Sequence, residues 1–283
     1  MDRKSNKKIM KSNKKYIILF FCLLFLILLI CHFNKKPPLN DNWPDSYSIT
    51  SSSQLNENLL TIKNVRNFRY GEKENVLNVN YYDKTYNLDD LIRVWYIYEP
   101  FGYAAHSFLS FEFKNDIFLT ISIEAKTNNH QTYNASAGIF RSYPLIYVVA
   151  DENDSILMRT NVRRNRVILY PMTMSSEDGK NLLLEMMREV NDLNVNPKWY
   201  NTINANCTNL IAYHINKINP GKIPSSWKLI LAGFADEVFY DKNLLDTNLP
   251  FKEAKSYYDI TEKSREIGDV YNYSKLIREK FNY

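Results

Sequence analysis

The pattern of apolar and polar positions begins with a long unbroken apolar run near the N-terminus. Residues 16–31 read YIILFFCLLFLILLIC, and His32 and Phe33 extend the run to 18 residues. At about 1.5 Å per helical residue, the run spans most of a hydrocarbon core about 30 Å thick. The pattern therefore predicts a transmembrane helix over residues 16–33, preceded by a basic segment over residues 1–15.

Two later segments have the spacing of amphipathic helices. After the capping candidates Ser175 and Ser176, apolar side chains recur at the helical spacing of a core helix: Leu182, Leu183, Met186, Met187 and Val190. The second predicted helix begins near Cys207 after a stretch rich in asparagine, and Pro220-Gly221 ends it. One face of this helix carries positions 207, 210, 211, 214, 215 and 218.

Residues 106–113 and 117–124 alternate as two β-strands. Between them, Lys114-Asn115-Asp116 makes a three-residue hairpin loop, in which Asn and Asp tolerate left-handed geometry. If Phe113 faces Ile117, one face of the hairpin is mostly apolar and His106 lies opposite Glu124. A slip of one residue would mix the two faces, so the pattern favours this register. A slip of two residues would instead place Ser122 or Lys126 opposite His106.

Residues 34–58 have the composition of a tether. The segment contains Pro37, Pro38, Pro44, a Ser51–Ser53 run and many Asn and Asp residues, which cannot bury enough apolar surface to fold alone. We therefore expect a flexible linker over residues 34–58 and one extracytoplasmic domain over residues 59–283.

The net charge of +5 is unevenly distributed. Residues 1–36 hold nine of the 36 Lys and Arg residues and one of the 31 acids, which leaves 27 bases and 30 acids, or −3, for the remainder. The basicity belongs to the N-terminal segment, and we expect no nucleic-acid partner. Seven basic residues precede the apolar run and two follow it closely, which predicts a cytoplasmic N-terminus and a domain outside the bacterial inner membrane.

A cleaved signal peptide is the competing interpretation of the same segment. No small-x-small cleavage site follows the run, where the sequence reads Asn34-Lys35-Lys36-Pro37-Pro38. Lipidation would require a small residue before the cysteine, but Cys31 follows Ile30 and Cys22 follows Phe21. We therefore expect an uncleaved signal anchor.

The extracytoplasmic domain contains one cysteine, Cys207, which has no partner within its own domain. Burial as a small hydrophobic residue, or an intermolecular disulfide, would explain it without any chemistry. However, Cys207 is also expected in the first turn of a helix, where free N–H groups and the helix dipole stabilise a thiolate. Taken alone, an inert buried cysteine is the simpler interpretation.

A nucleophilic cysteine needs a base, and His106 is the candidate among four histidines. His214 lies about 10 Å along the Cys207 helix, His32 lies at the membrane edge, and His130 lies in a polar loop. In the favoured register Glu124 can hold the His106 imidazole. A surface pair on a hairpin would look the same, but together with Cys207 the pattern favours a nucleophile, a base and an orienting carboxylate.

Other polar clusters predict less. The basic run formed by Arg159, Arg163, Arg164 and Arg166 could face phospholipid headgroups, but a solvated strand-and-turn surface is the simpler interpretation. Asp151, Glu152 and Asp154 lack the glycine and the terminal glutamate of a calcium loop. No phosphate loop, dinucleotide fingerprint or zinc spacing is found, so we expect no metal and no cofactor.

Five blocks of sequence together resemble a known bacterial family. In order, they read AHSFLSFEF, SIEAK, IYVVADENDSILMRTN, WYNTINANCTNL and GKIPSSWKLILAGFADEVFYD. They are similar to the N-terminal periplasmic domain of the Bacteroides lipoprotein N-acyltransferase, and the likeness runs from about residue 64 to residue 245. Two positions depart from the family pattern, with Lys126 in place of an arginine and Glu112 in place of a glycine.

The resemblance implies a fold and a set of site residues. The fold is α+β and circularly permuted papain-like (NlpC/P60-like), with an antiparallel sheet packed on a cysteine-bearing helix. Cys207 would be the nucleophile, His106 the base and Glu124 the orienting carboxylate. Asn201 would be the oxyanion donor, with Asn204 and Asn206 as alternatives. Helix capping explains any one of these asparagines equally well.

The implied function is that of a membrane-anchored, cysteine-dependent acyltransferase or acyl hydrolase, acting through a thioester on lipid or lipoprotein acyl groups. A cell-wall peptide hydrolase would use the same triad. A longer tether and a polar groove would favour the hydrolase, whereas an apolar trough beside Cys207 would favour acyl chains. A third possibility is a catalytically silent binding domain. The sequence leaves the acyl donor, the acceptor and the oligomeric state open.

Overall fold

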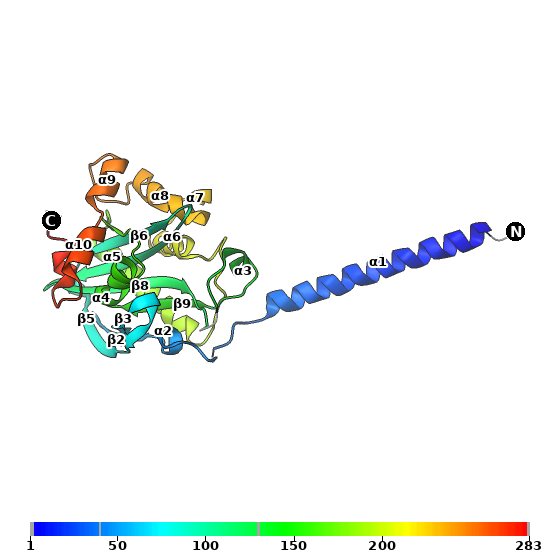
Figure 1. Ribbon diagram of the computed structural model, residues 1–283, viewed down its shortest axis with the longest axis horizontal. Coiled ribbons are helices and arrows are strands. Elements are labelled where there is room, and N and C mark those ends of the chain that lie inside the picture. Colours follow the sequence, from blue (N-terminus) through cyan, green and yellow to red (C-terminus); the bar gives the residue numbers. More distant parts are fainter. Residues whose placement is uncertain (1–2, 40, 129–130, 282–283) are drawn as a thin grey trace. The chain divides into compact units, whose positions relative to one another are not determined.

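The computed structural model describes residues 3–39, 41–128 and 131–281, so His130 lies outside the described residues. The chain divides into two compact units, and the boundary along the chain lies between Pro37 and Pro38 (Figure 1). The first unit contains helix α1 (Arg3–Asn34). Its Tyr16–Asn34 portion has a mean hydropathy of 2.9 and is long and apolar enough to cross a membrane. This portion coincides with the apolar run from which a span was predicted.

The second unit is built on a β-sheet. Within the described residues this sheet has eight strands in the order β1-β2-β9-β8-β7-β6-β10, with β5 also paired to β2. All pairs are antiparallel except β2 with β9. The strands of this sheet are β1 (Ser52–Asn56), β2 (Leu59–Arg66), β5 (Tyr81–Asn87), β6 (Leu91–Phe101), β7 (Ala104–Phe113), β8 (Ile117–Ala125), β9 (Leu145–Ala150) and β10 (Ile168–Pro171). A separate small sheet pairs β3 (Arg69–Tyr70) with β4 (Val76–Asn78).

Helices pack on both faces of the large sheet, and because its pairing is almost entirely antiparallel, the domain is α+β, as predicted. The α-helices are α2 (Asp45–Ser48), α3 (Ala135–Ile139), α4 (Glu152–Leu157), α5 (Ser176–Leu193), α6 (Cys207–Ile218), α7 (Trp227–Ile230), α8 (Ala235–Asp241), α9 (Phe251–Tyr257), α10 (Thr261–Ile267) and α11 (Tyr273–Leu276). A π-helical turn, η3 (Met158–Val162), continues α4, and the 3-10 turns are η1 (Glu72–Glu74), η2 (Leu88–Asp90) and η4 (Ala232–Phe234).

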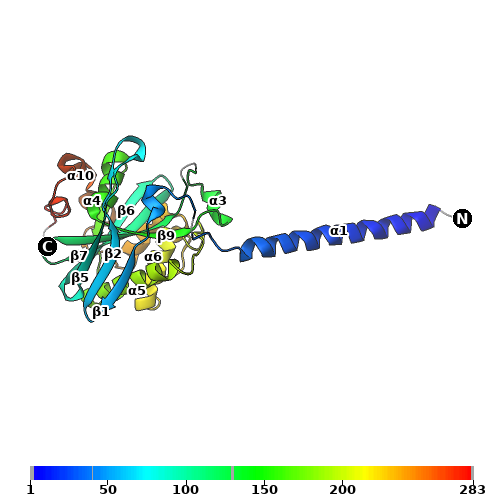
Figure 2. The same ribbon diagram turned by 90° about the horizontal axis from the view of Figure 1, so that it is seen from below.

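The two faces of the sheet are covered by different helices, and this separation positions the candidate site. Figure 2 shows α5 and α6 on one side of the sheet and α4 and α10 on the other. Because side chains alternate along a strand, odd-numbered residues of β7 face α5 and α6, and even-numbered residues face α4. Ser107 bonds Tyr96 on the α6 side, for example, whereas Ser110 bonds Glu152 of α4.

Several local predictions are confirmed. Ser175 caps α5 by accepting a hydrogen bond from the Asp178 N–H, and the five predicted apolar residues of α5 are all buried. In the β7–β8 hairpin, Phe113 faces Ile117 and Phe108 faces Ser122, the predicted register. Asn115 and Asp116 in its loop have positive φ angles of 61° and 56°. These features depend on local periodicity and turn chemistry, which the sequence displays directly.

The predicted linker over residues 34–58 is too long. The folded unit begins at Pro38, and β1 (Ser52–Asn56) is an edge strand of the large sheet. Asn191 of α5 bonds both the N–H and the carbonyl of Ser53, and Asn194 bonds the Ser51 carbonyl. The composition of this segment does not allow it to fold alone, but an edge strand needs only the backbone groups of its neighbour.

Candidate active site

The β7–β8 hairpin places His106 and Glu124 on the face of the sheet that α4 covers. The pairing of the two strands ends at Phe108–Ser122, so His106 and Glu124 lie just beyond the paired region. The His106 ring stacks on Phe108 with 5.7 Å between ring centroids. The strand register thus brings the candidate base and the candidate carboxylate together, as the alternation predicted.

A serine hydroxyl lies between these two residues. His106 Nε2 is 2.7 Å from Ser122 Oγ, which in turn donates to Glu124 Oε1 at 2.8 Å. The direct distance from His106 Nε2 to Glu124 Oε1 is 4.0 Å. Because the single hydroxyl hydrogen goes to Glu124, Ser122 accepts from Nε2–H, and this network assigns the free lone pair of His106 to Nδ1. The expected direct imidazole–carboxylate pair is therefore a relay through Ser122.

Arg159 is at the centre of this cluster. The prediction that it lies on a solvated basic surface is therefore wrong. Its side chain is 1% exposed and bonds Glu124 Oε1 at 3.1 Å and Glu99 Oε2 at 2.9 Å. The guanidinium also lies 4.3 Å from the centroid of the Phe108 ring and donates to the Ser155 carbonyl. A buried arginine needs such a set of acceptors, and these come from β6, β8 and α4. Local charge spacing contains no sign of them.

Two further arginines of the basic run are also paired. Arg163 bonds Glu74, and Arg166 bonds Asp259. Two residues of the acidic group at positions 151–154 also form ion pairs. Asp154 forms a salt bridge with Arg66, and Glu152 forms one with Arg278.

Tyr47 bonds the second carboxylate oxygen of Glu124. Its hydroxyl donates to Glu124 Oε2 at 3.0 Å, so both carboxylate oxygens accept hydrogen bonds from side chains. Tyr47 lies in α2, inside the segment that was predicted to be a linker. No periodicity marks this residue as part of a site. Only the path of the chain across the sheet brings it to Glu124.

The charges of the cluster are set by burial and by Arg159. Burial, the largest single effect, raises the pKa of Glu124, but the positive charges of Arg159 and Arg66 and the contacts with His106 and Ser122 together outweigh it and lower that pKa to about 2. Burial and the same positive charge lower the pKa of His106 to about 3, against the opposing effect of Glu124. At neutral pH the site therefore contains a neutral imidazole and an ionised carboxylate.

Cys207 begins α6, as predicted, and Asn206 caps this helix by accepting from the Asn209 N–H at 2.8 Å. The thiol is 3% exposed, and Thr208 Oγ1 is its side-chain neighbour at 3.8 Å. Burial raises the pKa of Cys207, and the backbone N–H of Ser107 acts in the opposite direction. The resting nucleophile candidate is thus a neutral thiol beside strand β7.

Cys207 and His106 lie close along β7 but on different sides of it. α6 covers the face that carries Ser107, and His106 points to the face that carries Arg159. Within the described part of the chain, no hydrogen bond joins Cys207 to His106. The charge of Glu124 nevertheless raises the pKa of Cys207, so the thiol and the relay are electrostatically coupled.

Two of the three asparagine candidates have side-chain contacts that hold the structure together. Asn201 Nδ2 donates to the Ile139 carbonyl, and Asn206 Nδ2 donates to the carbonyls of Thr202 and Leu229. Asn204 is exposed. The amide N–H groups of Asn201 and Asn206 are therefore already bonded to backbone carbonyls, and only Asn206 caps α6.

His214 is a core histidine. It is fully buried on α6, with Nε2 at 2.7 Å from the Tyr147 hydroxyl. Burial, reinforced by the positive charges of Lys198 and Lys217, lowers its pKa to about 4. It packs at the α6–β9 contact, away from the Ser122 relay.

The fold and the site define a membrane-associated α+β domain with a buried helix-initial thiol and a His–Ser–Glu relay on the adjacent hairpin. The family model described as Lnb N-terminal periplasmic domain matches residues 78–233, more than half of the chain, and this range contains Cys207, His106 and Glu124. The chain belongs to this family. No curated protein and no solved structure matches the chain. The family and α1 together fit a single-pass membrane protein with a periplasmic domain.

Proposed function

We propose that this protein is a membrane-anchored acyltransferase or acyl hydrolase that uses Cys207 as its nucleophile and lipid or lipoprotein acyl groups as substrates. In this proposal the N-terminus is cytoplasmic and the domain over residues 38–283 is periplasmic. One observation carries the proposal: the thiol of Cys207 is beside the N–H of Ser107, the residue after His106. The His106 imidazole is neutral, and its Nε2–H is held through Ser122 by Glu124, which leaves Nδ1 unprotonated.

The reaction follows from these roles. His106 Nδ1 takes the proton of Cys207 as the sulfur attacks the carbonyl carbon of an acyl ester. A C–S bond then forms, the ester C–O bond breaks, and the proton passes to the leaving alcohol. Glu124 stabilises the transient imidazolium through Ser122. An amine or a water molecule then attacks the thioester and returns the thiol.

The protonation states require the proton transfer and the attack to be coupled. Both partners are neutral at rest, because burial raises the pKa of Cys207 and lowers that of His106. A substrate must also bring the thiol and Nδ1 into hydrogen-bond range, since no hydrogen bond joins them at rest. Catalytic hydrogen bonds often become short only when substrate binds.

The surface beside the Cys207 helix supports an acyl substrate over a peptide. Asn206, the cap of α6, bonds the Leu229 carbonyl of α7. Phe234 contacts the rings of both Tyr103 and Trp227. The exposed apolar side chains around these contacts are Phe101, Tyr103, Trp227, Ile230 and Leu231. Such a patch is typical of a surface that binds lipid or protein. The connection between α1 and the folded unit is also short, three residues rather than a long tether.

A catalytically silent binding domain is the second candidate. The observation that favours it is the burial of Cys207, which packs in the main hydrophobic core and has no hydrogen bond to His106 within the described residues. In this case Cys207 would serve only as a small apolar side chain.

Trapping of the acyl-enzyme separates these candidates. The full chain, with Cys22→Ser and Cys31→Ser to remove the other thiols, is placed in nanodiscs that contain phosphatidylethanolamine with an alkyne-tagged acyl chain. We expect a hydroxylamine-sensitive tag on the peptide that contains Cys207. Cys207→Ala should abolish the tag, and His106→Ala and Glu124→Gln should reduce it by at least about 100-fold.

The matched control is Glu253→Gln, an exposed glutamate of α9. It should be tagged at the wild-type rate. A folded wild-type protein that acquires no tag from phospholipid or lipopeptide esters would support the binding domain instead. Tagging that does not depend on His106 would reject the proposed relay.

A further inference from the structure

A band of exposed apolar side chains lies at the end of the large sheet where β6 turns into β7. Tyr103 in that turn is 80% exposed, and Trp227 of α7 is 57% exposed. Phe234 joins the two, because its ring centroid lies 6.3 Å from that of Tyr103 and 5.4 Å from that of Trp227. The exposed members of this aromatic band are Phe101, Tyr103, Trp227, Ile230 and Leu231. Contiguous apolar surface of this kind marks an interaction site.

Hydrogen bonds connect the aromatic band to the segment between β8 and β9. Asn206 donates to the carbonyls of Leu229 in α7 and of Thr202. The Thr202 hydroxyl lies 3.0 Å from the hydroxyl of Tyr133. Tyr133 and Phe140, on either side of α3, are also exposed. Exposed aromatic side chains therefore continue from the β6–β7 turn to the β8–β9 connection.

The strand register explains why these segments share one end of the sheet. β7 begins at Ala104, directly after the turn that carries Tyr103, and it runs antiparallel to β8. The β7–β8 hairpin loop is at the far end, so β8 ends at Ala125 on the same end as Tyr103. β9 starts there as well, because Ala125 pairs with Leu145. Figure 1 shows α3 and α7 at this end of the folded unit.

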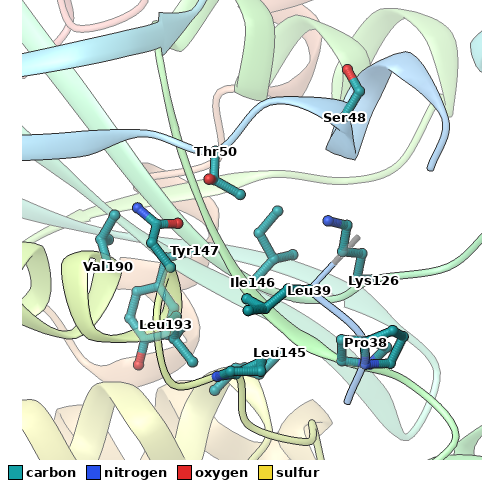
Figure 3. A pocket seen from close by; sticks show the side chains of 13 residues that line it. Pro38, Leu39, Ser48, Thr50, Lys126, Leu145, Ile146, Tyr147, Val190 and Leu193 are labelled. Carbon is teal, nitrogen blue, oxygen red and sulfur yellow. The ribbon is translucent and has the colours of Figure 1, made fainter. Parts of the chain in front are cut away.

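The chain from the membrane helix enters the folded unit at the same end. Pro38 and Leu39 line one cavity together with Lys126 and Leu145, which lie at the two ends of the β8–β9 connection (Figure 3). Only residues 35–37 separate α1 from Pro38. These residues reach at most about 14 Å, at about 3.6 Å per residue step. When α1 spans a membrane, the chain therefore holds this end of the folded unit close to the membrane surface.

The segments that carry the exposed aromatic side chains contain no acidic residue. Residues 101–106, 126–144, 199–209 and 224–234 hold three bases and no Asp or Glu, whereas the remainder of residues 37–283 holds 24 bases and 30 acids. Of the three bases, Lys228 pairs with Glu237 of α8. This end of the domain thus lacks the carboxylates that anionic headgroups would repel. Tyr and Trp are also the side chains that are enriched at the level of lipid headgroups.

We propose that the aromatic band docks on the surface of the membrane that α1 spans, with Tyr103, Trp227 and Leu231 at the level of the phospholipid headgroups. The exposed rings supply the apolar contact, and the short connection keeps them within reach of the lipid. The docking requires neither the Cys207 thiol nor the Ser122 relay. It therefore stands or falls separately from the proposed acyl chemistry.

A fluorescent probe within the aromatic band tests the docking in the full chain. In a Cys22→Ser, Cys31→Ser, Cys207→Ala background, Leu231→Cys carries a nitrobenzoxadiazole (NBD) probe. The protein is placed in nanodiscs of phosphatidylcholine and phosphatidylglycerol, with or without a lipid that has a nitroxide near the headgroup. We expect the nitroxide lipid to lower the fluorescence at position 231 at least about twofold, because a docked probe lies at headgroup depth.

Tyr271→Cys with the same probe is the matched control. Tyr271 is a fully exposed aromatic residue, and Lys275 nearby pairs with Asp116 in the β7–β8 hairpin loop, at the opposite end of the sheet. The nitroxide lipid should leave the fluorescence at position 271 unchanged. Equal quenching at positions 231 and 271 would overturn the proposal, because it would show that no particular face meets the lipid.

Loss of the rings should release the aromatic band from the membrane. Tyr103→Ser combined with Trp227→Ser should remove most of the quenching at position 231. Leu77→Ser combined with Tyr271→Ser changes two exposed side chains outside the band and should leave the quenching unchanged. All four side chains are exposed, and circular dichroism verifies that the variants fold. Unchanged quenching in the folded Tyr103→Ser, Trp227→Ser protein would overturn the role of these rings.

The probe at position 231 is decisive without the ring variants. No quenching there would overturn the docking. A blue-shifted NBD spectrum without quenching by the nitroxide lipid would also overturn it, and would show that protein, such as a second copy of the chain, covers the band. Because Cys207 is absent from this background, quenching at position 231 supports the docking even if the wild-type protein acquires no acyl tag.

Discussion

Arg159 and Glu124, 35 positions apart in the sequence, form an ion pair of 3.1 Å, and the same Glu124 oxygen accepts from Ser122, the partner of His106. The same guanidinium holds Glu99 at 2.9 Å. Arg159 thus fixes the carboxylate that orients the imidazole, and burial together with the Arg159 charge keeps that imidazole neutral. The stability of the domain and the protonation of the candidate site therefore depend on one buried side chain.

Removal of Arg159 should destabilise the domain strongly. Arg159→Met leaves Glu99 and Glu124 buried without their cation, and loss of one partner of a buried ion pair costs about 3–5 kcal/mol. Urea unfolding of the detergent-solubilised full chain, followed by tryptophan fluorescence, measures the loss. Arg188→Met is the control, because that arginine forms an exposed surface pair with Glu185 and should matter much less. Equal losses in the two variants would contradict the central role of Arg159.

Stability should fall as the pH drops below about 6.5. Folded His106 stays neutral down to a pKa of about 3, whereas an unfolded imidazole takes up its proton near 6.5. Between these values the unfolded state binds more protons, so stability present above pH 6.5 is lost on acidification, by up to about 1.4 kcal/mol per pH unit. His106→Gln should flatten this dependence between pH 7 and pH 5, as measured by urea unfolding. Parallel curves for the two proteins would show that His106 titrates normally.

Loss of the Tyr47 hydroxyl should weaken the attachment of α2 to the site. Tyr47→Phe removes the hydrogen bond to the ionised Glu124, and bonds to charged groups contribute about 1.5–3 kcal/mol. Tyr81→Phe is the matched control, since its hydroxyl donates to the Asp45 carbonyl, a neutral acceptor at an exposed position. The same unfolding assay should show the larger loss for Tyr47→Phe. If Tyr81→Phe costs as much, Tyr47 has no special relation to Glu124.

Cys207 should react slowly with alkylating agents in the resting protein. Its thiol is buried and its pKa is raised, so the thiolate is scarce at neutral pH. In the Cys22→Ser, Cys31→Ser background, the rate of iodoacetamide labelling should rise with a midpoint above the ordinary value of about 8.5. A midpoint below pH 7 that moves upward in His106→Ala would instead reveal a resting thiolate–imidazolium pair. It would also overturn the neutral ground state described above.

The sequence by itself determined the elements that depend on local periodicity. The apolar run, the β7–β8 register and the helix that starts at Cys207 follow from spacing and from capping residues, which act over a few positions. The register also placed His106 and Glu124 on one face, because a slip of one residue would have exposed the apolar face of the hairpin.

The tertiary structure alone decided how these elements combine. It brought Arg159 and Tyr47 to Glu124, inserted Ser122 between the expected pair, and made residues 52–56 an edge strand instead of a linker. The interactions of Arg159, Tyr47 and the edge strand join groups far apart in sequence. Which residues become their partners depends on which helix covers each face of the sheet. The periodicity of a strand shows only that one of its faces is buried.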